Sequence, residues 1–237
     1  MDSSIEHNIS LDKKKWIQKS KSYLQEIELE TVKSAHSGSL SVSMVKGRHQ
    51  LHTEKVIYSY EDLYRNFKVT ANKIDWSRFK PTKVLVLGLG LGSVIQIMEK
   101  KSLLPLEITA VEIDEAVVYL LNKYTAQSFK SPIEYIIADA YHFIQTNTEK
   151  YDLILFDIFI DDLIPPKFES LAFTKKLASC LATSGLILYN RVAIEPDQIM
   201  RNMHHFENVF LKVFPHAHFL DIKTNWVLVS DRRWLKL

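Results

Sequence analysis

One segment of the chain constrains the fold more than any other, because it joins two apolar runs through three alternate glycines. Residues 84–87 have the composition of a buried strand and residues 93–101 that of a helix, with Gly88, Gly90 and Gly92 between them. Glycine has no Cβ, so it allows turns of positive φ and lets the backbone approach a ligand closely. The amides that open the following helix can then face an anionic or polar ligand. The segment therefore predicts a strand, a glycine turn and a helix at a ligand site.

The next three apolar runs each end at an acidic residue, and these residues are Glu112, Asp139 and Asp157. In an open parallel sheet, ligands bind outside the carboxyl ends of the strands. A glycine turn with carboxylates at successive strand ends therefore predicts a nucleoside-binding crevice. A site for a nicotinamide dinucleotide is the less favoured alternative, because its fingerprint requires a third glycine where this chain has Ser93.

The second part of the chain has the pattern of an α/β protein. From residue 83 onward, apolar runs alternate with helical segments, which is typical of a doubly wound sheet. We predict strands at 84–87, 108–112, 135–138, 153–157 and 186–190, and helices at 93–101, 115–124, 141–146, 173–183 and 196–214. Two further strands, 218–222 and 226–229, are separated by three residues only. They must pair antiparallel, since a parallel pair needs a crossover of about a dozen residues or more.

The first part of the chain is β-rich. Residues 27–32 and 40–45 alternate between apolar and polar side chains, which predicts half-buried strands, and short strands are expected at 50–51 and 56–58. A helix is predicted at 61–74, with Ser59 as its cap. We expect a small β-rich domain with its connecting helix over residues 1–80, and the main α/β domain over residues 81–237.

Composition restricts the class of protein. A formal net charge of +2 gives no argument for nucleic acid or membrane binding, and no uncharged apolar run approaches the ~20 residues that span a bilayer. The polar segment from residue 1 to 11 lacks the apolar core of a signal peptide, and Cys180 is the single cysteine. We therefore expect a cytoplasmic protein without a disulfide. No cluster of residues predicts a metal site.

The residues that carry these patterns resemble a known family. A parallel sheet that ends in an antiparallel hairpin resembles the Rossmann-like, seven-stranded sheet of the class I S-adenosylmethionine-dependent methyltransferases. From about residue 25 onward, the chain resembles their spermidine synthase (aminopropyltransferase) branch. In that branch a Gln-Leu pair and a strand ending in Tyr-His-Glu precede the glycine motif, and here Gln50-Leu51 leads to Tyr58-Ser59-Tyr60. The resemblance also implies a homodimer formed through the amino-terminal β-rich part.

The resemblance implies roles for individual residues. Gly88, Gly90 and Gly92 match the glycine loop of the family. Glu112 matches the acid that holds the ribose hydroxyls, through charge-assisted hydrogen bonds. Asp139 matches the acid that contacts the adenine amino group, and Ala140 follows it as in the family. The implied cofactor is S-adenosylmethionine or its decarboxylated form, and the positions of Gln50 and Tyr58 imply contact with the substrate.

The catalytic positions differ from the family pattern. Leu91 stands where the family has an aspartate that pairs with the aminopropyl amine. The family sequence Asp-Ser-Ser-Asp-Pro corresponds to a run here in which Asp157 matches the first acid, Ile160 replaces the second, and Asp161 comes one position later. Asp157 and Asp161 are therefore the candidate catalytic residues. Because a leucine at position 91 does not repel a carboxylate, we expect the ordinary donor to be preferred.

These observations predict a transferase of the S-adenosylmethionine type that acts on a small-molecule acceptor, with amines among the candidates. Transfer from a sulfonium needs alignment, which can supply ~7–11 kcal/mol, and a base if the acceptor is protonated. We expect methyl transfer, with aminopropyl transfer less favoured. The alternative is a catalytically inactive nucleoside-binding homologue with a regulatory or assembly role, motivated by Leu91, Ser59 and Ile160.

Overall fold

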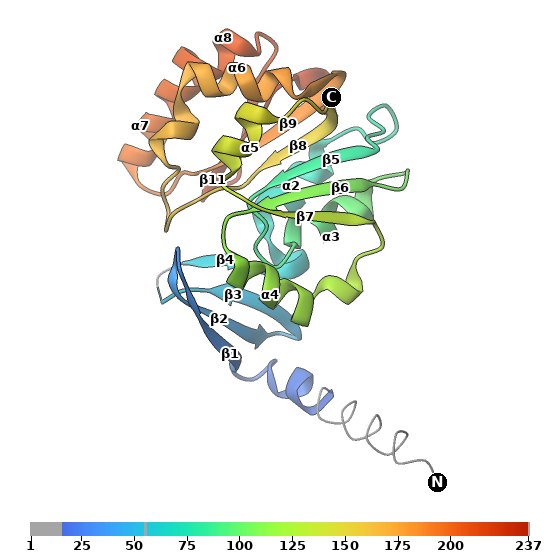
Figure 1. The fold of residues 1–237 in the computed structure, drawn as a ribbon, viewed down its shortest axis with the longest axis vertical. Helices are drawn as coiled ribbons and strands as arrows, with labels where there is room; N and C mark the ends of the chain where they lie inside the picture. The colour runs from blue at the N-terminus through green and yellow to red at the C-terminus, as the bar shows by residue number, and fades with distance from the viewer. Residues whose placement is uncertain (1–15, 55, 237) are drawn as a thin grey trace.

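The computed structural model describes residues 16–54 and 56–236, and these residues form two β-sheets. The smaller sheet is antiparallel and has the strand order β1-β2-β3-β4; its strands are β1 (Ile27–Ser34), β2 (Gly38–Val45), β3 (Arg48–His52) and β4 (Ile57–Ser59). The larger sheet has seven strands in the order β10-β11-β9-β8-β5-β6-β7. Figure 1 labels all of them except β10. The polar segment on which the localisation prediction depends, residues 1–11, lies outside the described residues.

Strands β5 to β9 of the large sheet run parallel, and the last two strands are antiparallel to them. The strands are β5 (Lys83–Leu87), β6 (Glu107–Glu112), β7 (Ile133–Ile137), β8 (Tyr151–Phe156), β9 (Leu181–Val192), β10 (His218–Asp221) and β11 (Asn225–Val229). From β5 the chain builds outward through β6 and β7, and it then returns to add β8 on the other side of β5. Such a reversal in strand order opens a crevice at the carboxyl ends of the two central strands.

Helices cover both faces of the large sheet. The helices are α2 (Arg65–Lys73), α3 (Ser93–Lys101), α4 (Glu115–Tyr124), α5 (Ala140–Thr146), α6 (Leu171–Ser179), α7 (Pro196–His205) and α8 (Leu211–Val213). Successive residues of a strand point to opposite faces. In β5, accordingly, Val84 and Val86 belong to the core that includes α2, α3 and α4, while Leu85 and Leu87 belong to the core that includes α5 and α6. The predicted α/β fold with its terminal hairpin is confirmed.

The small sheet packs against one of these two layers. Figure 1 shows the small sheet beside α4. Leu40, Val42 and Leu51 of β2 and β3 lie in the same apolar core as α3 and α4. The hydroxyl of Ser34 at the end of β1 also donates a hydrogen bond to Asp114, the N-cap of α4. The division into residues 1–80 and 81–237 and the formation of a homodimer remain predictions. Within the described residues, no helix has the length and apolar composition needed to cross a membrane.

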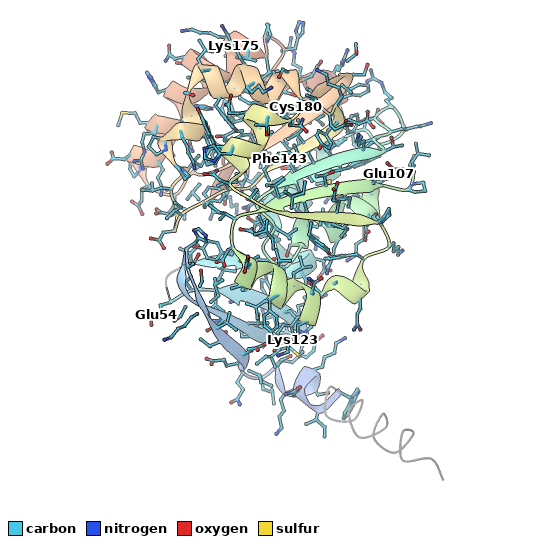
Figure 2. The ribbon with its side chains drawn as sticks, in the orientation of Figure 1. Glu54, Glu107, Lys123, Phe143, Lys175 and Cys180 are labelled. Carbon is cyan, nitrogen blue, oxygen red and sulfur yellow. The ribbon has the colours of Figure 1, made fainter. Side chains whose placement is uncertain are left out.

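Four local predictions differ from the structure. The helix predicted at 173–183 ends at Ser179, and Leu181 begins the long strand β9; Cys180 lies buried between the two elements (Figure 2). The helix predicted at 61–74 is a 3₁₀ turn, Glu61–Leu63, followed by α2. Ser59 does not cap that helix, because it lies in β4 and its hydroxyl is 2.6 Å from that of Ser93. The helix predicted at 196–214 contains a π-helical segment, Phe206–Phe210.

The central strand β5 offers a test of the packing. Leu85 is fully buried in the core that includes α5 and α6, so Leu85→Ala leaves a cavity between sheet and helices. We expect urea unfolding to give a free energy of unfolding lower by about 2–5 kcal/mol. Leu103→Ala is the matched control, because Leu103 is 64% exposed. Equal effects of the two variants would contradict the assigned layers.

Candidate functional site

A cavity of about 330 Å³ lies at the carboxyl ends of β5, β6 and β8. This volume is within the range of ~300–1,000 Å³ that is usual for small-molecule sites. The predicted site residues that line it are Tyr58, Gly88, Gly90, Glu112, Asp139, Ala140 and Asp157. Residues from five separate parts of the chain therefore meet at the crevice that the strand order predicts.

The glycine turn forms one wall of the cavity because its backbone packs directly against β8. Gly88 has a φ of +86°, and a Cβ there would lie 2.3 Å from the carbonyl oxygen of Asp157. Any other residue at position 88 would push the ends of β5 and β8 apart. Gly92 is not among the cavity residues that the structure describes; it is the N-cap of α3, and a Cβ there would meet the ring of Phe129.

Glu112 lines the cavity, and only some of the hydrogen-bond acceptor positions of its carboxylate are occupied. Its Oε2 accepts a hydrogen bond from the Leu89 amide at 2.9 Å, and its Oε1 accepts one from the Asp114 amide at 3.1 Å. Burial raises the pKa of Glu112, while these backbone amides act in the opposite direction. A carboxylate has about four acceptor positions. Glu112 can therefore still accept hydrogen bonds from a ligand with hydroxyl groups.

Asp139 is held at the start of α5. Its Oδ1 accepts a hydrogen bond from the Tyr141 amide at 2.8 Å and so caps the helix. Its Oδ2 lies 2.5 Å from Nζ of Lys167, which comes from the segment after β8. Burial alone would raise the pKa of Asp139, but the bonds from Lys167 and the Tyr141 amide outweigh it and lower the pKa. Asp139 is therefore an ionised acceptor at neutral pH.

Asp157 lies at the end of β8 in a different environment. Its Oδ1 accepts hydrogen bonds from the Tyr64 hydroxyl at 3.1 Å and from Nδ2 of Asn190 at 2.8 Å. Asn190 is itself fixed by Asn225, whose Nδ2 donates to Oδ1 of Asn190 at 3.0 Å. Burial raises the pKa of Asp157 to about 6, against the opposing effect of these two donors. A carboxyl group with a pKa near neutrality is suited to accept or release a proton.

Several cavity residues carried no signal that we recognised in the sequence. Lys167 and the β1–β2 turn residues His36 and Ser37 line the cavity, and Tyr64 and Asn190 hold its buried acid. Asn190 has the clearest signal in hindsight, because it is a polar residue at the predicted end of a buried strand, as Asp157 is. His36 and Ser37 lie in a turn, Lys167 lies in a short 3₁₀ helix and Tyr64 is the N-cap of α2. The position of such segments relative to the sheet does not follow from local periodicity.

Besides Gly92, three sequence-predicted features lie outside this cavity. Gln50 is buried in the small sheet and is not among the described lining residues, and Asp161 lines a neighbouring cavity instead. Leu91 is fully buried in the core. Because the Leu91 side chain does not line the cavity, our argument from this position for the ordinary donor is wrong.

The sequence matches one family model. The model of the spermine/spermidine synthase domain matches residues 61–227. Among curated proteins, the polyamine aminopropyltransferase 2 of Hyperthermus butylicus is 29% identical over 142 residues. That match covers 56% of this chain and 45% of the relative, so it spans less than half of the relative's length.

Solved structures share the fold at lower sequence identity. A probable spermidine synthase from Corynebacterium glutamicum gives a TM-score of 0.65 at 16% identity, covering 86% of this chain and 79% of that one. The spermidine synthase of Thermotoga maritima gives 0.60 at 15% identity, covering 86% and 72%. Human methyltransferase-like protein 13 in complex with SAH gives 0.56 at 23% identity, covering 70% and 79%.

The environment of Asp157 predicts a pH-dependent effect on stability. Its pKa is raised on folding, so the native state loses stability as the pH rises from about 4 through 6, and the loss is constant above that range. Asp157→Asn keeps an oxygen for Tyr64 and Asn190 but cannot ionise. We expect its free energy of unfolding to exceed that of the wild type by a margin that widens to at most about 3 kcal/mol above pH 6.

Urea unfolding between pH 4 and pH 8 measures this margin. Asp161→Asn serves as the control, because it removes an exposed carboxylate from the loop that follows the same strand. A margin for Asp157→Asn that does not change with pH would contradict the burial of an ionisable acid at this position.

Proposed function

Because the chain belongs to the spermine/spermidine synthase family, we propose that it is a transferase that moves an aminopropyl group from an S-adenosyl sulfonium donor to a small amine. The observation that carries the proposal is a single cavity in which Asp157, with a pKa of about 6, lies beside two further strand-end carboxylates. Gly88 and Gly90 of the glycine turn line the same cavity as these three acids.

The residues of the cavity fit the adenosine part of such a donor. We propose that Glu112 accepts hydrogen bonds from the two ribose hydroxyls, for which it has free acceptor positions. Asp139 would accept a hydrogen bond from the exocyclic amine of adenine, next to Ala140. The backbone from Gly88 to Gly90 lines the cavity and would pack along the nucleoside. Tyr58 would contact the acceptor or the transferred group.

Asp157 is the proposed base. When bound, the donor supplies a carbon attached to a positively charged sulfur; the C–N bond forms as the C–S bond breaks, and the sulfur keeps the electron pair as a neutral thioether. The amine of the acceptor must lose a proton to attack, and the Asp157 carboxylate takes that proton. Tyr64 and Asn190 both donate to one oxygen of Asp157, so they orient the carboxyl group. Its other oxygen is then available to the acceptor.

The relatives favour aminopropyl transfer over our sequence-based preference for methyl transfer. One relative is named an aminopropyltransferase and two structural neighbours are named spermidine synthases, whereas one neighbour is named methyltransferase-like. The position of Leu91 no longer argues for the methyl donor, because its side chain is in the core. The comparisons give no support to the alternative of a binding protein without turnover.

Titration calorimetry with three nucleosides tests the donor site. We expect methylthioadenosine and decarboxylated S-adenosylmethionine to bind, and ordinary S-adenosylmethionine to bind more weakly. Glu112→Gln should weaken binding by about 10- to 100-fold, since hydrogen bonds to a charged group contribute about 1.5–3 kcal/mol. Glu115→Gln, an exposed position on α4, is the matched control. Tighter binding of the ordinary donor would favour methyl transfer, and no nucleoside binding would refute the proposal.

The pH dependence of turnover tests the role of Asp157. With labelled decarboxylated donor and saturating amine, kcat/KM for the donor should fall about tenfold per pH unit below about pH 6, because the base becomes protonated. Asp157→Asn should lose most of the activity and also the break in the profile near pH 6, while it still binds methylthioadenosine. An unchanged break in this variant would assign the base to another group.

A further inference from the structure

A second cavity, of about 530 Å³, adjoins the first one. Its walls are the loop from Ile160 to Pro166, the end of β9 and the inner face of α7. Ile160 and Pro165 line both cavities, so one loop separates the two spaces. A molecule held in the second cavity therefore lies beside the site proposed for the donor.

Arg191 is the unusual residue of this second cavity. Its side chain is 3% exposed, and it follows directly after Asn190, the partner of Asp157. Its Nε donates to Oδ1 of Asn202 at 2.7 Å, and Nη2 forms an ion pair with Glu169. Its Nη1 is buried and has no hydrogen-bond partner. A buried donor without a partner is costly, so a guanidinium nitrogen of this kind calls for an acceptor that the chain itself does not supply.

The groups around Arg191 are held in place by further hydrogen bonds. Nδ2 of Asn202 donates to the Val192 carbonyl at 2.8 Å. Gln198 accepts from the amides of Ile194 and Glu195 through Oε1, and its Nε2 donates to Asp162 at 2.7 Å. The floor of the cavity is therefore a preorganised polar frame, which lowers the cost of binding a charged ligand.

The remaining charges of the cavity are divided between the two signs. Arg201 of α7 adds a second, exposed cation, and Asp161 and Asp162 of the loop after β8 add carboxylates. A pure diamine would have to place an ammonium group beside Arg201 and the Arg191–Glu169 pair, whereas a pure dicarboxylate would meet Asp161, Asp162 and Glu169. A ligand with an amine at one end and a carboxylate at the other is complementary to both.

We propose that the second cavity holds the acceptor substrate and that this acceptor is an amino acid. Its carboxylate accepts hydrogen bonds from Nη1 of Arg191 and from Arg201, and its amine points past Asp161 toward Asp157. This inference rests on the proposed function, because it identifies the class of amine that receives the transferred group. It also gives Asp161 a role, since an aspartate one position late in the loop faces the acceptor cavity.

Two ligands of the same chain length test the proposal. We titrate the full chain, with and without methylthioadenosine, with 4-aminobutanoate and with 1,4-diaminobutane, which differ only in one terminal group. The wild type should bind 4-aminobutanoate at least about tenfold more tightly than the diamine. Arg191→Gln should abolish this preference, because an amide has no charge and lacks the planar fork of donors that matches a carboxylate.

A second variant keeps the test decisive if Arg191→Gln does not fold. Arg201 is exposed, so Arg201→Gln should fold normally and still weaken 4-aminobutanoate binding several-fold. Arg65→Gln, an exposed arginine of α2 outside both cavities, should leave both affinities unchanged.

The outcomes separate this inference from the proposed function. If the wild type prefers the diamine, or if Arg201→Gln and Arg191→Gln bind 4-aminobutanoate as the wild type does, the acceptor is not an amino acid in this cavity. Methylthioadenosine binding would then leave the donor site intact. If no nucleoside binds but 4-aminobutanoate binding depends on both arginines, the proposed function fails and the carboxylate site remains.

Discussion

The close approach of β5 and β8 at their carboxyl ends is the constraint on which the site depends. The Asp157 amide donates to the Leu87 carbonyl at 2.8 Å, and the Gly88 amide donates to the Val111 carbonyl at 3.0 Å. These two bonds continue the sheet pairing one residue beyond the strands, and only glycine fits at position 88 against the Asp157 carbonyl. The three central strands are thus tied together where their acids begin. Without this contact, Glu112 and Asp157 would not face one cavity.

The parts of the fold that follow from the sequence are those with a strong period. Buried parallel strands appear as short apolar runs, and the three-residue link before β11 permits only an antiparallel pair. The position of the acids at the strand ends could also be predicted, because the carboxyl ends of parallel strands lie at the same edge of a sheet. The boundary between α6 and β9 could not be predicted, because the residues around Cys180 are compatible with a helix or a strand. The 3₁₀ turn before α2 likewise has no periodic signal.

Side-chain direction within irregular segments could not be predicted. Leu91 occupies a position that is polar in the resembled family, yet in this turn its side chain enters the core and Thr125 binds its carbonyl. Asp161 has a φ of +54°, so the loop turns there and presents the residue to the second cavity. The particular role of Arg191 could not be predicted, because it depends on a nitrogen that is left unpaired when the side chain packs against Glu169 and Asn202. A sequence motif therefore predicts the course of the backbone, whereas the direction of each side chain depends on its tertiary contacts.

The three strand-end carboxylates of the first cavity would repel one another if they were equivalent, and the structure makes them different. Glu112 is bound by backbone amides, which orient it but leave acceptor positions free. Asp139 is neutralised by Lys167, so it can approach a nucleobase without adding net charge. Asp157 has only two uncharged donors, and burial therefore raises its pKa to about 6. Of the three groups, Asp157 alone combines a position at the crevice with a pKa in the range where proton transfer is efficient, and this asymmetry supports the proposal that it takes the proton of the acceptor.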